Sequence, residues 1–182
     1  MEHGPLYTVT ERFHPGGDAA EWEQYRRWSG LDLTELISLD PTLCPSVLQE
    51  IRDEDWPHVV NQDFMLRYFT DLDHLVRRVG SLHDRNLLAV HRNPESEPTT
   101  PLSPGHQFVF EGYDLVGVDG GASALSNCGG FPKAFANAEL TPHGLLSSLG
   151  RANEVRRTLR DRYPSEPHAV CDVWAIHRAV MT

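Results

Sequence analysis

The chain has 182 residues, 40% of them hydrophobic, and a formal net charge of −10 at pH 7; this suits one domain with a substantial core and excludes nucleic acid as the expected ligand, because phosphates require clustered positive charge. No run approaches the roughly 18 apolar residues of a membrane span, and the start lacks the basic-then-apolar order of a signal peptide. We therefore expect a cytoplasmic protein without a membrane partner, folded as one domain over residues 1–182.

The first predicted elements are a strand and an aromatic helix. Residues 6–13 alternate as an edge strand does. After a His-Pro-Gly-Gly turn, Asp18 can cap a helix that Gly30 ends. Three aromatic residues at helical spacing are expected to face the core from this helix: Trp22, Tyr25 and Trp28.

The next stretch predicts a series of short elements. Residues 33–39 have the pattern of a strand, and residues 46–54 have the pattern of a short helix with an apolar inner face. Residues 64–69 are expected to form a helix or a turn. Thr70, with an acid three residues later, resembles a capping box and predicts a helix that ends at Gly80.

The middle of the chain predicts strands separated by a polar loop. Residues 86–91 are strand-like, and they lead into a proline-rich segment, residues 93–105, that is expected to be an exposed loop. Residues 106–111 and 114–118 have strand patterns. The Asp119-Gly120-Gly121 sequence after them is a hairpin signal, because tight hairpin turns need positive φ.

The last elements are a long helix and an apolar strand. Thr141 followed by Pro142 predicts a helix start, and the apolar face continues to Tyr163. Residues 168–180 are apolar on both faces, which indicates an interior strand. The irregular order of strands and helices predicts an α+β fold, with a mixed or antiparallel sheet and helices packed on it.

One stretch has the character of an enzyme site. Cys128 leaves a predicted strand into two glycines whose N–H groups could activate a thiolate and hold an oxyanion. His168 and Asp172 follow in the order that some thiol hydrolases use. On one strand, however, they would lie roughly 13 Å apart. A tight turn with a purely structural role is the competing interpretation.

No metal or cofactor is expected. The ten histidines and three cysteines include no pair with the short spacing of a zinc site. Rossmann, P-loop and nucleophile-elbow motifs are also missing from the sequence. The three cysteines are therefore interpreted as free thiols in a reducing compartment.

The negative charge is concentrated in the first half of the chain. Residues 1–100 contain 18 acidic and 9 basic side chains, whereas residues 101–182 contain 8 and 7. An acidic run with an aromatic residue lies in that first half and is the predicted partner-binding site: Asp53, Glu54, Asp55, Trp56 and Asp63. Acids around a tryptophan suit a basic protein partner. A solvated surface is the competing interpretation.

Three functions remain open. The leading hypothesis is a small acidic protein-binding module, an inhibitor or immunity-type protein that covers a basic partner. Fifteen of the 16 basic residues are arginine, a bias typical of GC-rich coding that favours a bacterial source. The alternatives are a hydrolase or transferase that uses Cys128 with a histidine, and a small-ligand sensor with a pocket between helices and sheet.

Overall fold

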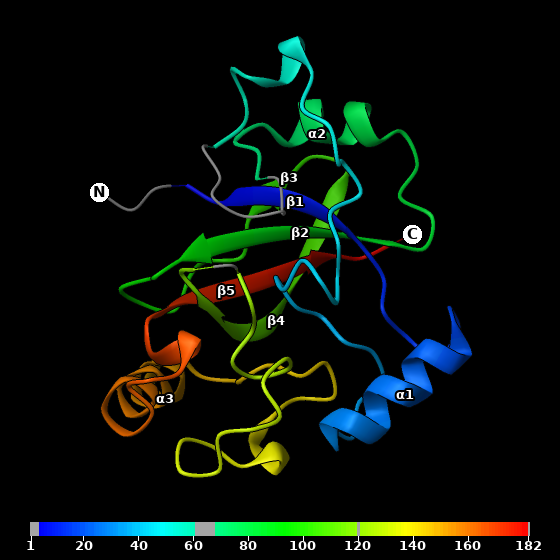
Figure 1. Cartoon of the computed structure of the whole chain (residues 1–182). Coiled ribbons are helices and arrows are strands. Elements are labelled where there is room, and N and C mark those ends of the chain that lie inside the picture. The colour runs from blue at the N-terminus through cyan, green and yellow to red at the C-terminus, as the bar shows by residue number, and fades with distance from the viewer. Residues whose placement is uncertain (1–3, 61–67, 120, 182) are drawn as a thin grey trace.

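A five-stranded antiparallel sheet in the order β1-β2-β5-β4-β3 forms the centre of the molecule (Figure 1). The computed structural model describes residues 4–60, 68–119 and 121–181. Together with three helices, this sheet confirms the α+β prediction and selects its antiparallel form. The strands are β1 (Leu6–Glu11), β2 (Arg85–Arg92), β3 (Leu102–Ser103), β4 (His106–Gly117) and β5 (Cys171–Ala179).

The edge and the centre of the sheet are occupied as the sequence predicts. β1 is an edge strand, and β5 lies between β2 and β4. Seven of the nine residues of β5 are buried, and the other two are half-buried. β5 starts at Cys171, because Pro167–Ala169 form a short 3₁₀ turn, η3. His168 therefore lies in this turn and not on the strand, which corrects the predicted start.

A β-bulge joins the two strands predicted at residues 106–118 into the single strand β4. The register shifts between Phe110 and Gly112, so one extra residue bends the strand while pairing with β5 continues. Gly112 has a φ of 143°. A Cβ atom there would lie 2.7 Å from both the Leu145 Cβ and the Leu146 carbonyl oxygen, so glycine is required by both backbone conformation and packing.

The described residues contain three α-helices, which are α1 (Ala19–Ser29), α2 (Leu72–Val79) and α3 (Leu149–Arg162). For α1 the predicted caps are confirmed, because the Asp18 side chain accepts from two backbone N–H groups and Gly30 is left-handed. The aromatic row is confirmed in part, since Trp28 is 54% exposed while the other two rings are buried.

The predicted starts of the later helices shift. Asp71, not Thr70, caps α2, and its carboxylate accepts from the His74 N–H. α3 starts after Ser148 rather than Thr141. The chain before it bonds elsewhere, because Leu146 exchanges backbone hydrogen bonds with Tyr113 of β4. That pairing prevents residues 141–146 from continuing a helix.

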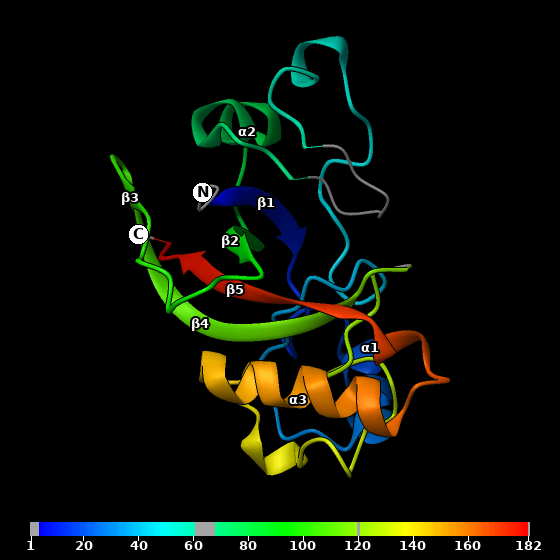
Figure 2. The ribbon, with the colours of Figure 1, turned by 90° about the vertical axis from the view of Figure 1, so that its left-hand side faces the viewer.

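The two faces of the sheet are covered differently (Figure 2). α2 and α3 pack on the same face of the sheet. Ala175 and Ala179 are four residues apart on β5, so their side chains point to the same side. Ala175 belongs to the apolar cluster that includes α3, and Ala179 belongs to the one that includes α2. The opposite face, with Trp174 and Ile176, packs against a segment that contains Ile37. This segment, residues 31–44, forms no helix or strand and is called the irregular layer. No described helix is long and apolar enough to cross a membrane.

Two predictions for the chain between α1 and α2 are wrong. Residues 33–39 are not a strand, although Leu36 and Ile37 are buried. Their backbone groups bond to three different segments, so no continuous ladder forms. Residues 46–54 are not a helix, because Val47 donates its N–H to the edge strand β1 instead of to a helical turn. The prediction for residues 64–69 falls largely outside the described residues.

The proline-rich segment between β2 and β4 is tied back to the fold. Its end contributes β3, which pairs with the start of β4. The Glu97 carboxylate accepts hydrogen bonds from the Tyr113 hydroxyl and from the Leu149 N–H at the start of α3. The hairpin turn predicted at residues 119–121 includes Gly120, which lies outside the described residues. The residues on its two sides form one isolated bridge, between Val116 and Ser123, and not a second strand.

Candidate functional site

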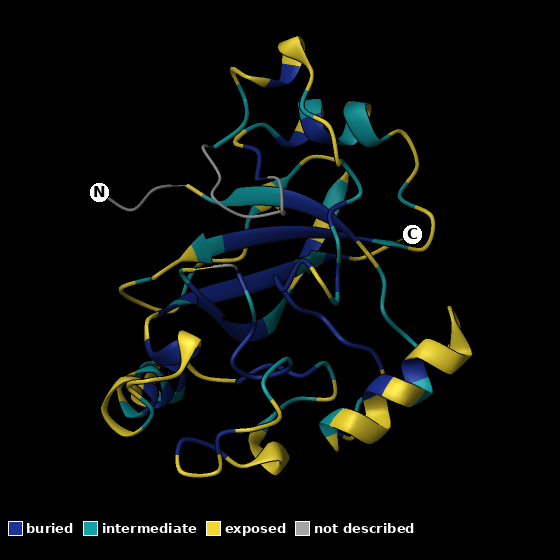
Figure 3. Cartoon of the chain, in the orientation of Figure 1, coloured by how far each residue is buried: buried dark blue, intermediate teal, exposed yellow. Residues whose placement is uncertain are grey.

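The predicted acidic run lies on a turn at one end of the molecule. Asp53–Asp55 form a 3₁₀ turn, η1, which lies beyond α2 and is largely exposed (Figure 3). Trp56 directly follows it and is 64% exposed. Trp56 is therefore not part of the core. An exposed tryptophan is accessible to a partner, and tryptophan is among the residues enriched at binding hot spots.

Asp55 fastens this turn to α2. Its side chain is 0% exposed and accepts hydrogen bonds from the Arg52 N–H at 2.8 Å, from His74 Nε2 at 2.8 Å and from Arg78 Nε at 3.0 Å. Burial acts to raise the pKa of Asp55, but these three hydrogen bonds outweigh it and the pKa lies below its ordinary value. Asp55 is thus a buried anchor, which corrects its prediction as part of an exposed rim.

The remaining acids of the run surround the tryptophan. Asp53 and Glu54 are exposed beside Trp56, and Glu50 is exposed a few residues earlier. Arg52 is the basic residue among them, with its side chain 58% exposed. Asp63 lies outside the described residues. Sequence reasoning identified the patch but could not separate the one buried acid from its exposed neighbours.

Two histidines stack beneath the turn. The rings of His58 and His74 are 4.3 Å apart between centroids and nearly parallel. Each faces a carboxylate, with His58 Nδ1 3.6 Å from Asp71 Oδ2 and His74 bonded to Asp55. Ring stacking and contacts between the histidines and carboxylates thus connect the chain on both sides of Trp56 to α2, and they limit the freedom of the turn.

The candidate enzyme residues are not joined by hydrogen bonds within the described chain. The Cys128 Sγ donates to the Ala124 carbonyl oxygen at 2.8 Å and accepts from the Gly130 N–H at 3.3 Å. His168 is buried against Phe131, and neither ring nitrogen has a partner among the described residues. Asp172 instead binds Arg92 at 2.6 Å and Asn93 at 2.7 Å.

Burial controls the protonation of these groups. It raises the pKa of Cys128 to about 11 and that of Cys171 to about 12, and it lowers the pKa of His168. A buried neutral histidine can still accept a proton in a reaction. The Cys128 thiol, however, is protonated at neutral pH, whereas a nucleophilic cysteine needs its thiolate.

Alkylation of the thiols should therefore be slow near neutral pH. We expect the Cys128 rate to rise about tenfold per pH unit between pH 7 and 9.5 without a plateau, since only the thiolate reacts. Cys44 and Cys171, which are buried, should react more slowly still. Mass spectrometry after timed iodoacetamide labelling measures all three. A Cys128 rate that reaches its plateau below pH 8 would restore the thiol-enzyme hypothesis.

A buried polar cluster joins the irregular layer to β4, and sequence reasoning missed it. Asp114 is 1% exposed and accepts from the Ser38 and Ser123 hydroxyls at 2.7 and 2.6 Å and from the Leu39 N–H. Burial raises the pKa of Asp114 more than these hydrogen bonds lower it. Asp40, also buried, accepts from Ser123 N–H and Asn127. The cluster is fully bonded and closed to solvent, so it is structural.

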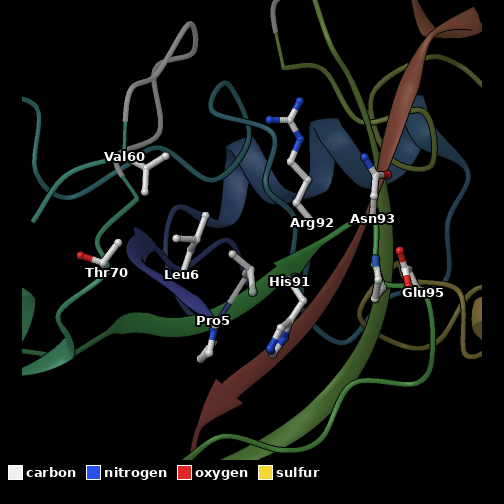
Figure 4. A pocket seen from close by; sticks show the side chains of 11 residues that line it. Pro5, Leu6, Val60, Thr70, His91, Arg92, Asn93 and Glu95 are labelled. Atoms are coloured by element: carbon white, nitrogen blue, oxygen red, sulfur yellow. The ribbon is translucent and has the colours of Figure 1, made fainter. Parts of the chain in front are cut away.

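A cavity of about 630 Å³ lies beside the ends of β1 and β2 (Figure 4). Leu6, Val60 and Thr70 lie on one side of it, and Arg92 and Asn93 lie on the other. Its volume suits a small ligand. Arg92 and Asn93 both bind Asp172, and the Thr70 hydroxyl donates to the His58 carbonyl oxygen.

Metal ligands do not gather anywhere in the part of the chain that the structure describes: no group of three or more histidine, cysteine or acidic side chains is arranged to hold an ion. Comparison of the chain with protein-family models, curated proteins and solved structures finds no significant match. The α+β sheet and the geometry of its surface are therefore the grounds on which a function can be proposed.

Proposed function

We propose that the protein is a protein-recognition module, an inhibitor or immunity-type protein that covers a basic surface of a partner. The observation that carries the proposal is Trp56, 64% exposed next to a turn that the buried Asp55 holds in place. Tryptophan is among the residues most enriched at binding hot spots. Its exposure places a large apolar side chain where a partner can bury it.

The fixed turn supports this proposal through the cost of binding. The Asp55 bonds to Arg78 and His74 hold the backbone before Trp56 in one conformation. A loop that is ordered before binding loses less conformational entropy in the complex, so more of the contact energy appears as affinity. The same tryptophan on a freely moving loop would be a weaker anchor.

The charge around Trp56 supports a basic partner. Three exposed acids, Glu50, Asp53 and Glu54, lie near it against one exposed base, Arg52. The half of the chain that contains them has 18 acidic and 9 basic residues. Such a field speeds encounter with a positively charged surface, and salt screens it within roughly 8 Å at physiological ionic strength.

The partner can be isolated with a matched pair of variants. We expect the immobilised protein to retain a basic protein from a bacterial lysate, Trp56→Ala to lose it, and Trp28→Ala to keep it. Trp28 is a suitable control, because it is 54% exposed on α1 at the opposite end of the molecule from η1 (Figures 1 and 2). If every captured protein binds all three forms equally, the proposed function is wrong.

Binding kinetics with the purified partner then distinguish the role of Trp56 from that of the acidic residues Asp53 and Glu54. Trp56→Ala should raise the dissociation rate about 30-fold, which corresponds to about 2 kcal/mol for a central hot spot. Asp53→Asn and Glu54→Gln should mainly slow association and weaken its salt dependence, because exposed charges steer encounter. Surface plasmon resonance across salt concentrations measures both. Unchanged association of the two charge variants would remove the electrostatic part of the proposal.

A further inference from the structure

A chain of ion pairs runs across the sheet on the face opposite α2 and α3. Arg178 of β5 is at its centre and donates to Glu111 of β4 and to Glu35 of the irregular layer, each at 2.8 Å. Arg12, just beyond β1, donates to both oxygens of Glu35 at 2.8 and 3.1 Å. His143 extends the chain by contacting Glu111 at 2.7 Å. Two other segments thus bind the Arg178 guanidinium directly, and Arg12 and His143 in turn hold the two carboxylates.

The Arg178 guanidinium has N–H donors that the bonds to Glu111 and Glu35 do not use. A guanidinium carries five N–H groups, and the bonds to Glu111 and Glu35 use Nε and Nη1. Nη2 has no partner among the residues that the structure describes. Because the bonds of Nε and Nη1 orient the planar guanidinium, the N–H groups of Nη2 have a fixed direction and can donate to a charged acceptor.

A cavity of about 560 Å³ opens over these groups. Arg178, Arg12 and Glu111 line its polar side. Its apolar side is unusual in being exposed, since Val109, Val180 and Met181 are 45%, 44% and 55% exposed and all line the cavity. Apolar side chains gathered beside polar groups in a hollow are the general composition of small-ligand sites.

We propose that this cavity binds a small organic monocarboxylate with a short apolar chain. The carboxylate would accept hydrogen bonds from the spare N–H groups of Arg178, and the apolar chain would cover Val109, Val180 and Met181. Glu111 and Asp84 also line the cavity. These carboxylates oppose a dianion such as phosphate, and the arginines oppose a cation, so a single negative charge on an apolar body fits best. The site is independent of the Trp56 surface.

Hexanoate is a suitable probe. We expect a saturable interaction with the intact protein, with a Kd on the order of 1 mM for a ligand of about eight non-hydrogen atoms. Two-dimensional NMR should show the largest shifts at the ends of β4 and β5. Hexan-1-ol and hexylammonium have the same chain without the carboxylate, and they should bind at least about tenfold more weakly.

Variants locate the site. Val109→Asp, checked for folding by circular dichroism, should weaken hexanoate binding at least about tenfold by placing a negative charge on the wall of the cavity, where Val109 is 45% exposed. Leu102→Ala is the control, because Leu102 is 96% exposed nearby on β3 and does not line the cavity. Arg178→Lys, checked for folding by circular dichroism, should also weaken binding. The proposal is overturned if hexanoate does not saturate, if hexan-1-ol binds equally well, or if Val109→Asp has no effect.

Discussion

Replacing Gly112 with alanine should lower the free energy of unfolding by about 4 kcal/mol, as the sum of backbone strain at positive φ and overpacking. The new Cβ would lie 2.7 Å from the Leu145 Cβ and from the Leu146 carbonyl oxygen. Neither can move cheaply, because Leu145 is fully buried and Leu146 pairs with Tyr113 through its backbone. Chemical denaturation with urea measures the loss directly.

Gly105→Ala separates the two contributions. Gly105 also has a positive φ, 86°, but a Cβ there would meet nothing within 4 Å. Its replacement should therefore cost only the strain, on the order of 1 kcal/mol. If both variants lose the same stability, the close packing at the bulge is not what requires glycine at position 112.

Asp55→Asn should lower the free energy of unfolding by about 3 kcal/mol at neutral pH. The amide removes the buried carboxylate that lies 3.0 Å from the nearly buried Arg78 guanidinium, 9% exposed, and leaves only the exposed Glu54 carboxylate at 4.0 Å among the described residues. Removal of one partner from a buried pair is far more costly than loss of a surface pair. Asp53→Asn, two residues earlier and exposed, should change stability by less than about 0.5 kcal/mol. Equal effects would mean that Asp55 does not anchor the turn.

The pH dependence of this variant is a second test. The pKa of Asp55 is lowered by folding from an ordinary value of 3.8, so its contribution is complete above that value and is lost as the pH falls below it. Asp55→Asn should therefore be least stable relative to wild type at neutral pH, and the difference should shrink below about pH 4. A difference that grows on acidification would contradict the assigned ion pair.

The elements that sequence reasoning predicted correctly are those whose pattern is local. The capping residues Asp18 and Gly30 lie directly at the two ends of α1. The apolar run of β5 indicates by itself that the strand is buried. Residues 33–39 failed because their partners are remote. Leu39 donates to Asp114, 75 positions away, and no window of sequence around Leu39 contains that information.

The candidate site shows the same division. The acidic run and Trp56 could be found from composition, but whether Asp55 is exposed depends on Arg78 and His74 of α2, 23 and 19 positions away. Arg178 could not be predicted as a site residue from the sequence. It lies within an apolar strand, and its role depends on hydrogen bonds to Glu35 and Glu111 on other segments. A charged residue inside an otherwise buried strand was the signal that could have drawn attention to it.

The position of β5 has a consequence for how the chain folds during synthesis. β5 is the final strand in sequence and the central one in space, and β2 and β4 pair with it rather than with each other. While the ribosome is adding residues 118–170, β1 and β2 can already pair, but β4 lacks its central neighbour β5. The sheet is therefore completed only after β5 emerges. Until then the unpaired backbone edges of β2 and β4 are exposed to chaperones and to aggregation.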